Sequence, residues 1–131
     1  MTAFLDAKFV YTQSNNESVM VGFADDQFNT TEYILLQRML DPLQEGNNSQ
    51  QEDVYIEINE QKYGAYGGVR SIVLSADLVV ISLGTATASK LHLEEDIEVS
   101  ISTAALDFEE LREALELLCS DVVEFKLAGN C

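Results

Sequence analysis

The middle of the chain alternates between apolar and polar positions with a period of two residues, which predicts β-strands. In residues 54–59 every second position is Val or Ile, the pattern of a strand with one buried face. Val69–Leu74 is a further strand candidate, and Leu78–Leu83 is apolar on both faces, which predicts a central place in a sheet. The connection between the first two strands is rich in Tyr, Gly, Gln and Glu. We expect it to be a loop that presents side chains for recognition.

Two strands are also predicted near the N-terminus. Residues 7–13 place Phe9 and Tyr11 on one side, and residues 18–23 place Val or Phe at every second position. The polar residues between these two segments are typical of a turn, so a hairpin is expected.

The next apolar segment, residues 33–40, is compatible with a strand or a helix. Its β-branched and aromatic residues favour a strand, in which Tyr33 and Leu35 share one face. Proline follows shortly afterwards and ends the element, because it cannot donate to a sheet ladder. Residues 44–53 are polar throughout and are expected to form a mobile loop.

In the C-terminal third the periodicity changes from that of a strand to that of a helix. Residues 97–101 alternate like a strand, whereas residues 107–119 carry apolar side chains at helical spacing. Asp107 is expected to cap this helix and Glu110 to complete a capping box, in which the cap alone stabilises by ~1 kcal/mol. Residues 122–127 are expected to add a last short strand.

These elements predict one α+β domain over residues 1–131. We expect a mainly antiparallel, meandering sheet of about six to eight strands, with the amphipathic helix of residues 107–119 packed on one face. A chain of 131 residues that is 47% hydrophobic removes roughly 65–70% of its unfolded surface from water, enough for a true core.

Composition adds a strong charge asymmetry. Twenty-three acidic residues against seven basic ones give a net charge of −16, which disfavours nucleic acids and anionic membranes as partners and attracts a basic protein. The alternative is that the acidic residues only keep the surface soluble. No apolar run is long enough to cross a bilayer, and the N-terminal residues lack the features of a signal peptide, so a cytoplasmic location is expected.

Cysteine and histidine do not indicate a metal or redox site. Cys119 and Cys131 form no CxxC pair, and His92 is not spaced from them as zinc ligands are. We expect both cysteines to be reduced, His92 to point outward, and the protein to need no cofactor or metal.

Two groups of residues are candidates for sites of chemistry. Glu57 and Glu60 could divide acid and base roles, but no activated nucleophile or histidine accompanies them, so surface carboxylates are the favoured interpretation. Gly64, Gly67 and Gly68 suggest a phosphate loop, but they lie between two predicted strands rather than at the start of a helix. A structural role, with positive φ in a hairpin or bulge, is therefore expected.

The tyrosines of the same region favour recognition. Tyr55, Tyr63 and Tyr66 surround the polar connection, and a tyrosine can bury a large area while it keeps a hydrogen-bonding group. For Tyr63 and Tyr66 partner recognition and packing within the protein stay equally open, whereas for Tyr55 packing is favoured.

The order of these motifs resembles the immunity protein 10 family of bacterial polymorphic toxin systems, over about residues 31–120. The chain resembles the family in the order of an EYILLQR segment, an acidic polar loop, a VYIEINEQ strand, a YGG sequence, an apolar strand pair and a C-terminal helix. The residues that carry the resemblance are Leu36, Gln37, Arg38, Tyr55, Glu57, Asn59, Gln61, Tyr66, Gly67 and Gly68.

The resemblance implies a non-enzymatic antidote that binds a cognate toxin domain, expected to be basic, in the cell that produces it. Tyr63, Tyr66 and Arg38 are then candidate anchors of the interface. Two other classes stay open, an acidic adaptor or oligomerising module and a small enzyme that uses the Glu57 region. The motif residues could also serve the fold instead of a partner. The remaining candidate contact residues are Glu57, Glu60 and Gln61.

Overall fold

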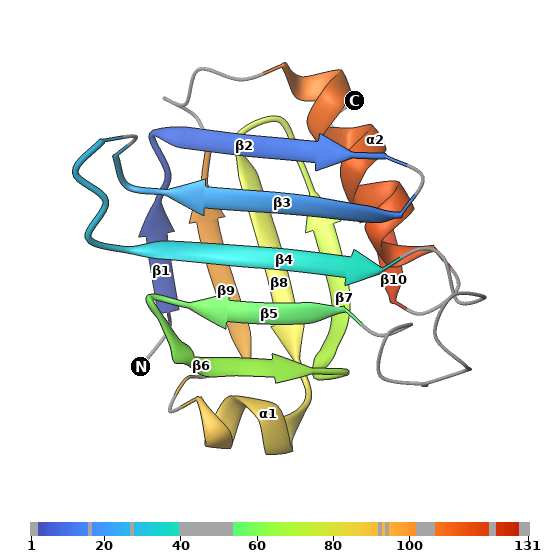
Figure 1. Ribbon diagram of the computed structural model, residues 1–131. Coiled ribbons are helices and arrows are strands. Elements are labelled where there is room, and N and C mark those ends of the chain that lie inside the picture. The colour runs from blue at the N-terminus through green and yellow to red at the C-terminus, as the bar shows by residue number, and fades with distance from the viewer. Residues whose placement is uncertain are drawn as a thin grey trace.

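The described part of the chain forms two facing β-sheets and two helices (Figure 1). The structure is a computed structural model. It describes residues 3–15, 17–26, 28–39, 54–91, 93, 95–101, 107–120 and 123–128. The predicted loop at residues 44–53, the cysteine at 131 and the histidine at 92 lie outside these residues.

The first sheet, here called the meander sheet, has five strands in chain order, and every neighbouring pair is antiparallel. The predicted hairpin and the predicted strand at residues 33–40 are both confirmed in it. Its strands are β2 (Phe9–Ser14), β3 (Ser18–Ala24), β4 (Tyr33–Met39), β5 (Tyr55–Ile58) and β6 (Glu60–Tyr66).

The second sheet, here called the mixed sheet, also has five strands, in the order β1-β9-β8-β7-β10. Its three central strands are antiparallel neighbours, whereas the two edge strands each pair in parallel with theirs. Figure 1 shows that its strands run across those of the meander sheet. Its strands are β1 (Ala3–Asp6), β7 (Val69–Leu74), β8 (Leu78–Leu83), β9 (Asp96–Ser100) and β10 (Glu124–Leu127).

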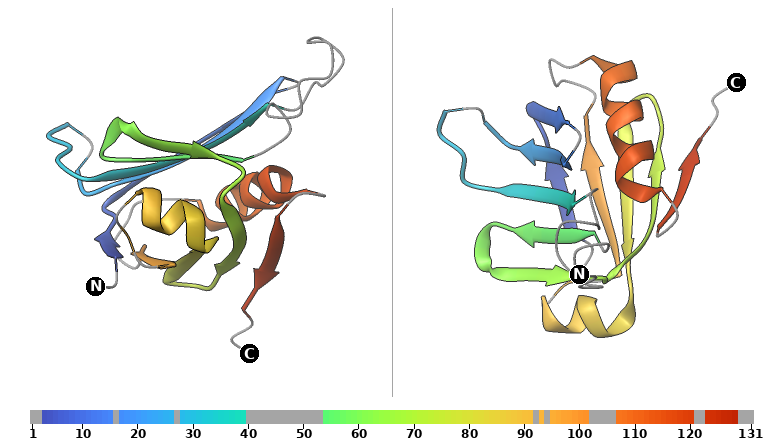
Figure 2. Two further views of the ribbon diagram at one scale, coloured as in Figure 1. Left: turned by 90° about the horizontal axis from the view of Figure 1, so that it is seen from below. Right: turned by 45° about the vertical axis from the view of Figure 1, so that its right-hand side comes forward.

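Two helices complete the fold (Figure 2). Helix α1 (Thr85–Lys90) directly follows β8, and helix α2 (Phe108–Cys119) contacts β2 and β3 of the meander sheet and β7 and β10 of the mixed sheet. The predicted cap is confirmed, because the Asp107 side chain accepts a hydrogen bond from the amide of Glu110 at 3.2 Å. Glu110 in turn accepts from the hydroxyl of Thr12 at 3.0 Å, which joins α2 to β2.

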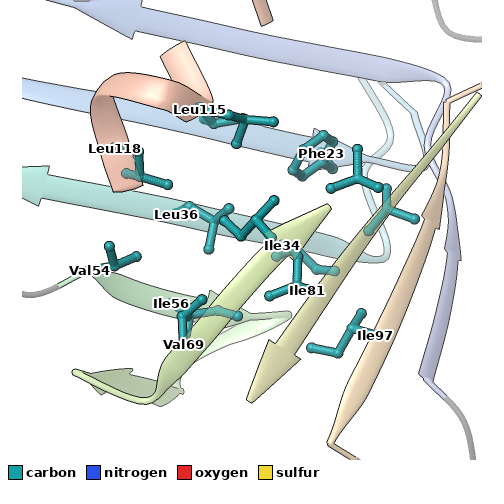
Figure 3. Close-up of a cluster of buried hydrophobic side chains, with 14 of the residues drawn as sticks. Phe23, Ile34, Leu36, Val54, Ile56, Val69, Ile81, Ile97, Leu115 and Leu118 are labelled. Carbon is teal, nitrogen blue, oxygen red and sulfur yellow. The ribbon is translucent and has the colours of Figure 1, made fainter. Parts of the chain in front are cut away.

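The hydrophobic core lies between the two sheets and is closed on one side by α2. In Figure 3, side chains of the meander sheet such as Phe23 and Leu36 point toward those of the mixed sheet such as Ile81 and toward Leu115 of α2. Each of these four side chains is fully buried, and the described core contains no buried polar or charged side chain. The two sheets therefore share one interior.

The fold class is α+β as predicted, but the arrangement of the strands differs from the expected single sheet. The described strands form two sheets rather than one, and two of the strand pairs are parallel. Helix α1 was not predicted, because its six residues TATASK carry no apolar stripe. A period of two tells which side chains face the core, but it does not tell which strands pair, so the sequence left the division into sheets open.

The expected Tyr- and Gly-rich loop is largely a strand. Residues 60–66 form β6, which pairs antiparallel with β5, and the chain then passes from the meander sheet into the mixed sheet. Gly67 takes a φ of 75° at this corner, as expected for a glycine with positive φ. At Gly68 a Cβ atom would lie 2.0 Å from the hydroxyl of Thr87, so this glycine instead lets α1 approach the corner closely.

Candidate protein-binding face

The side of the meander sheet that faces away from the core is rich in aromatic and apolar side chains. Strand register brings together, from one edge to the other, Tyr11, Gly22, Leu35, Glu57 and Gly64. We call the set of residues that the register places on this side the tyrosine face, and among its described side chains Glu57 is the one that carries a charge. The set consists of Phe9, Tyr11, Gln13, Ser18, Met20, Gly22, Ala24, Tyr33, Leu35, Gln37, Met39, Tyr55, Glu57, Gly64 and Tyr66.

Glu57 is held at the centre of a hydrogen-bonded bridge between two strands. The hydroxyl of Tyr55 donates to Oε1 of Glu57 at 2.7 Å, and the hydroxyl of Tyr33 on β4 donates to Oε2. All three side chains are half-buried. The carboxylate therefore has one donor on each oxygen, and the bridge fixes its orientation on the sheet.

Tyr55 is further fixed by its neighbours on β6. A Cβ atom at Gly64 would lie 2.3 Å from the Tyr55 hydroxyl oxygen, so the phenol lies over this glycine. On its other side the Tyr55 ring contacts that of Tyr66, with 4.9 Å between ring centroids and a tilt of 47°. Tyr66 is 55% exposed, so this pair offers a pre-ordered aromatic surface to solvent.

The environment of Tyr55 also keeps its hydroxyl protonated. Burial, followed by the hydrogen bond to Glu57, raises the pKa of Tyr55 to about 12. The phenol is therefore neutral at physiological pH and remains a hydrogen-bond donor to the carboxylate.

Next to the bridge the tyrosine face has an apolar recess. Gly22 and Ala24 provide little or no side chain, and the larger residues Phe9, Tyr11 and Leu35 surround them. Tyr33 also lines this recess, so a single residue borders both the recess and the Glu57 bridge.

The loop between β3 and β4 is ordered by two carboxylates. Asp26 accepts from the amides of Phe28 and Asn29, at 2.9 and 3.0 Å, and Asp25 accepts from Thr31. These hydrogen bonds lower the pKa of both aspartates, chiefly through the Thr31 side chain for Asp25 and through the Asn29 amide for Asp26. The loop exposes 84% of Phe28 at one end of the same sheet.

A comparison with known protein families shows which family this chain belongs to. Its residues 6–109 match the family model described as immunity protein 10. The chain belongs to the immunity protein 10 family. The match begins earlier than the resemblance at residues 31–120, so it includes the first hairpin and the whole tyrosine face. A search among curated proteins returns no significant match.

In this member of the immunity protein 10 family, the predicted contact residues divide between the two sides of the meander sheet. Glu57 and Tyr66 lie on the tyrosine face, together with Tyr55, for which packing was favoured. Tyr63 lies on the opposite side and packs against the core. Residues 60 and 61 lie in β6, and their side chains are outside the described part of the structure.

Arg38 also lies away from the tyrosine face, where it joins β4 to the end of α2. Its Nη1 atom donates to the carbonyl oxygens of Leu117, Leu118 and Ser120, at 3.3, 3.2 and 2.6 Å. A cation at a helix C-terminus satisfies free carbonyls and interacts favourably with the helix dipole. These contacts give Arg38 a role within the fold, while its role as an interface anchor stays a prediction.

Several residues of the face were not singled out from the sequence. The alternation did place Phe9 with Tyr11, and Tyr33 with Leu35, on common strand faces. It could not show that all four point to the same outer side, because that depends on the pairing of three strands. The signal available was that these strands carry large apolar residues on both faces.

The described part of the structure does not indicate a metal site or a membrane span. Within it, no three or more His, Cys, Asp or Glu side chains are grouped so as to hold a metal ion. Neither of its helices has the length and hydropathy to cross a membrane. Cys119 is free and buried, and burial raises the pKa of its thiol to about 12.

Proposed function

We propose that this chain is a non-enzymatic immunity protein that binds a cognate bacterial toxin domain and neutralises it in the cytoplasm of the producing cell. Membership of the immunity protein 10 family supports the class of function. The observation that carries the proposal for this chain is the tyrosine face, an outward surface whose contact side chains are already ordered.

The composition of the face is that of the centre of a protein interface. Such centres are depleted in charge and enriched in Tyr and Met, and tyrosine buries much area at a low cost in side-chain entropy. The described side chains of the tyrosine face include one carboxylate among fifteen residues, in a protein with a net charge of −16. Its three exposed large side chains, those of Tyr11, Met39 and Tyr66, come from three different strands.

The remaining acidic charge supports a basic partner. Exposed carboxylates on α2, such as Glu110 and Glu113, lie outside the tyrosine face and add to a long-range negative potential. Such a field accelerates association with a positively charged protein and opposes association with polyanions. We therefore propose a basic toxin domain as the partner, rather than a nucleic acid or an anionic membrane.

The test is rescue and binding with the toxin domain encoded beside this gene. Co-expression of this chain should restore growth of cells that produce the toxin, and the purified proteins should form a stoichiometric complex by calorimetry. Tyr66→Ala should raise Kd roughly 10- to 100-fold, as expected for an aromatic anchor.

The matched control is Phe4→Ala, which removes an exposed aromatic ring from the mixed sheet. Phe4 is 58% exposed, close to the 55% of Tyr66, and it lies on a different sheet. Its substitution should leave Kd unchanged. Rescue that fails, or binding that depends on Phe4 and not on Tyr66, would contradict the proposal. Self-association without toxin binding would instead favour an oligomerising module.

A further inference from the structure

Glu57 is a half-buried carboxylate whose partners are neutral. The ion pairs of the described residues join Arg70 to Glu95 and Arg112 to Glu109 and Glu116, and none reaches Glu57. Its two hydrogen-bond donors are phenolic hydroxyls. A carboxylate that is half removed from water and held by neutral donors gains strongly when a cation arrives.

The geometry of the bridge selects the kind of cation. A carboxylate has about four acceptor positions, two on each oxygen. Tyr33 occupies a position on Oε2 and Tyr55 one on Oε1, so each oxygen keeps capacity for a further donor. The planar guanidinium of arginine donates two parallel hydrogen bonds to the two oxygens of one carboxylate, whereas lysine acts as a point charge.

The surrounding rings favour the same ligand. Tyr55 and Tyr66 are in ring contact on one side of the carboxylate, and Tyr33 approaches it from the neighbouring strand. Aromatic faces attract guanidinium groups by cation–π interaction and stacking. Tyr66 is more than half exposed, so a side chain from another protein can reach this cluster from solvent.

We propose that Glu57 and the rings of Tyr33, Tyr55 and Tyr66 form a receptor for one arginine side chain of the bound toxin domain. The identity of the partner rests on the proposed function, whereas the receptor itself rests on the bridge and the rings. We call these four residues the arginine receptor.

A small-molecule probe tests the receptor without any toxin. The amide of N-acetyl-arginine is titrated into the isotope-labelled protein, and the tyrosine ring resonances are followed by NMR. Saturable shifts of the Tyr33, Tyr55 and Tyr66 rings are expected. N-acetyl-citrulline amide, a neutral molecule of the same shape, should cause none. Rings that do not respond, or that respond equally to citrulline, would overturn the receptor.

Variants separate the receptor from general electrostatic attraction. Glu57→Gln removes the charge and should abolish the saturable shifts. The matched control Glu98→Gln removes a charge from the outer side of β9 and should preserve them. If Glu57→Gln proves unfolded by circular dichroism, Tyr66→Ala replaces it, since its exposed side chain can be removed without opening the core. That variant should weaken probe binding about two- to fivefold by loss of one cation–π contact.

Measurements of binding to the toxin domain then distinguish failure of the arginine receptor from failure of the proposed function. Glu57→Gln should raise Kd roughly 10- to 100-fold, as for loss of a charge-assisted hydrogen-bonded pair, and should reduce the dependence of Kd on salt. An unchanged Kd in a complex that forms normally overturns the receptor and leaves the proposed function standing. If wild type binds the arginine probe but no toxin, the receptor stands and the proposed function fails.

Discussion

The outer faces of the two sheets share one strand periodicity but differ in chemistry. The tyrosine face of the meander sheet has aromatic and apolar residues around one bridged carboxylate. The outer face of the mixed sheet combines apolar residues with charges, such as Asp96 and Glu98 on β9 and Lys126 on β10. On this side Asp96 accepts from the hydroxyl of Ser82 at 2.9 Å, and Arg70 pairs with Glu95 in an exposed ion pair.

Under the proposed function, the two faces contribute to binding in different ways. Exposed charges act over distances of about a Debye length, so they influence encounter more than the bound state. Tyrosines act only on contact, and they contribute most where water is excluded. Under the proposed function, the acidic surface attracts the partner and the tyrosine face forms the stable contact.

The largest loss of stability is expected from a substitution in the core that both sheets share. Phe23 is fully buried under the meander sheet, so Phe23→Ala should lower the free energy of unfolding by about 3–5 kcal/mol through lost burial and a cavity. Tyr11→Ala is the control on the outer side of the same sheet. At 42% exposure it should cost far less, and equal losses in urea denaturation would contradict the assignment of inner and outer faces.

A smaller loss of stability is expected at the inner side of β4. Arg38→Met removes the hydrogen bonds to the three carbonyl oxygens at the end of α2, and should lower the free energy of unfolding by about 1.5–3 kcal/mol. Arg70→Met removes only an exposed ion pair and should cost less than about 1 kcal/mol. If Arg38→Met weakens toxin binding while stability is unchanged, Arg38 is an interface anchor instead.

Two glycines of the tyrosine face allow a paired test of the Tyr55 position. Gly64→Ala places a Cβ atom on the Tyr55 phenol, so the ring must move and stability should fall by about 1–2 kcal/mol. The Cβ atom of Gly22→Ala meets its nearest side chain at 3.8 Å, an ordinary contact, and alanine suits a strand better than glycine. Thermal unfolding should therefore show a loss for the first variant and none for the second.

A further effect is expected in alkaline solution. The folded pKa of Tyr55, about 12, lies above its ordinary value of 10, so its contribution to stability is complete below pH 10 and is lost as pH rises through 12. The difference in unfolding free energy between wild type and Tyr55→Phe should shrink over this interval. A constant difference, or tyrosinate absorbance that shows Tyr55 ionising near pH 10, would contradict the environment described for this phenol.

Local features of the fold were predictable from the sequence, whereas long-range pairings were not. Asp107 could be identified as a helix cap because the capping signal lies within four residues of sequence. The Tyr33–Glu57 contact spans 24 residues and exists only because β4 pairs with β5 in one register. Residues 60–66 were expected to be a loop because glycine and polar residues are poor strand formers, and pairing with β5 overrides that preference.

The bridged carboxylate also weakens binding of partners that have no cation opposite Glu57. A protein that covers Glu57 removes water from it, and a partner with no cation at that point leaves a dehydrated, uncompensated charge. Such a charge costs at least about 1–3 kcal/mol, so mismatched surfaces bind several-fold to a hundredfold more weakly without any steric clash. If the chain binds a toxin domain as proposed, this one acidic residue among tyrosines discriminates between toxins of similar shape. The choice of partner can then change through few outward side chains while the core keeps its packing.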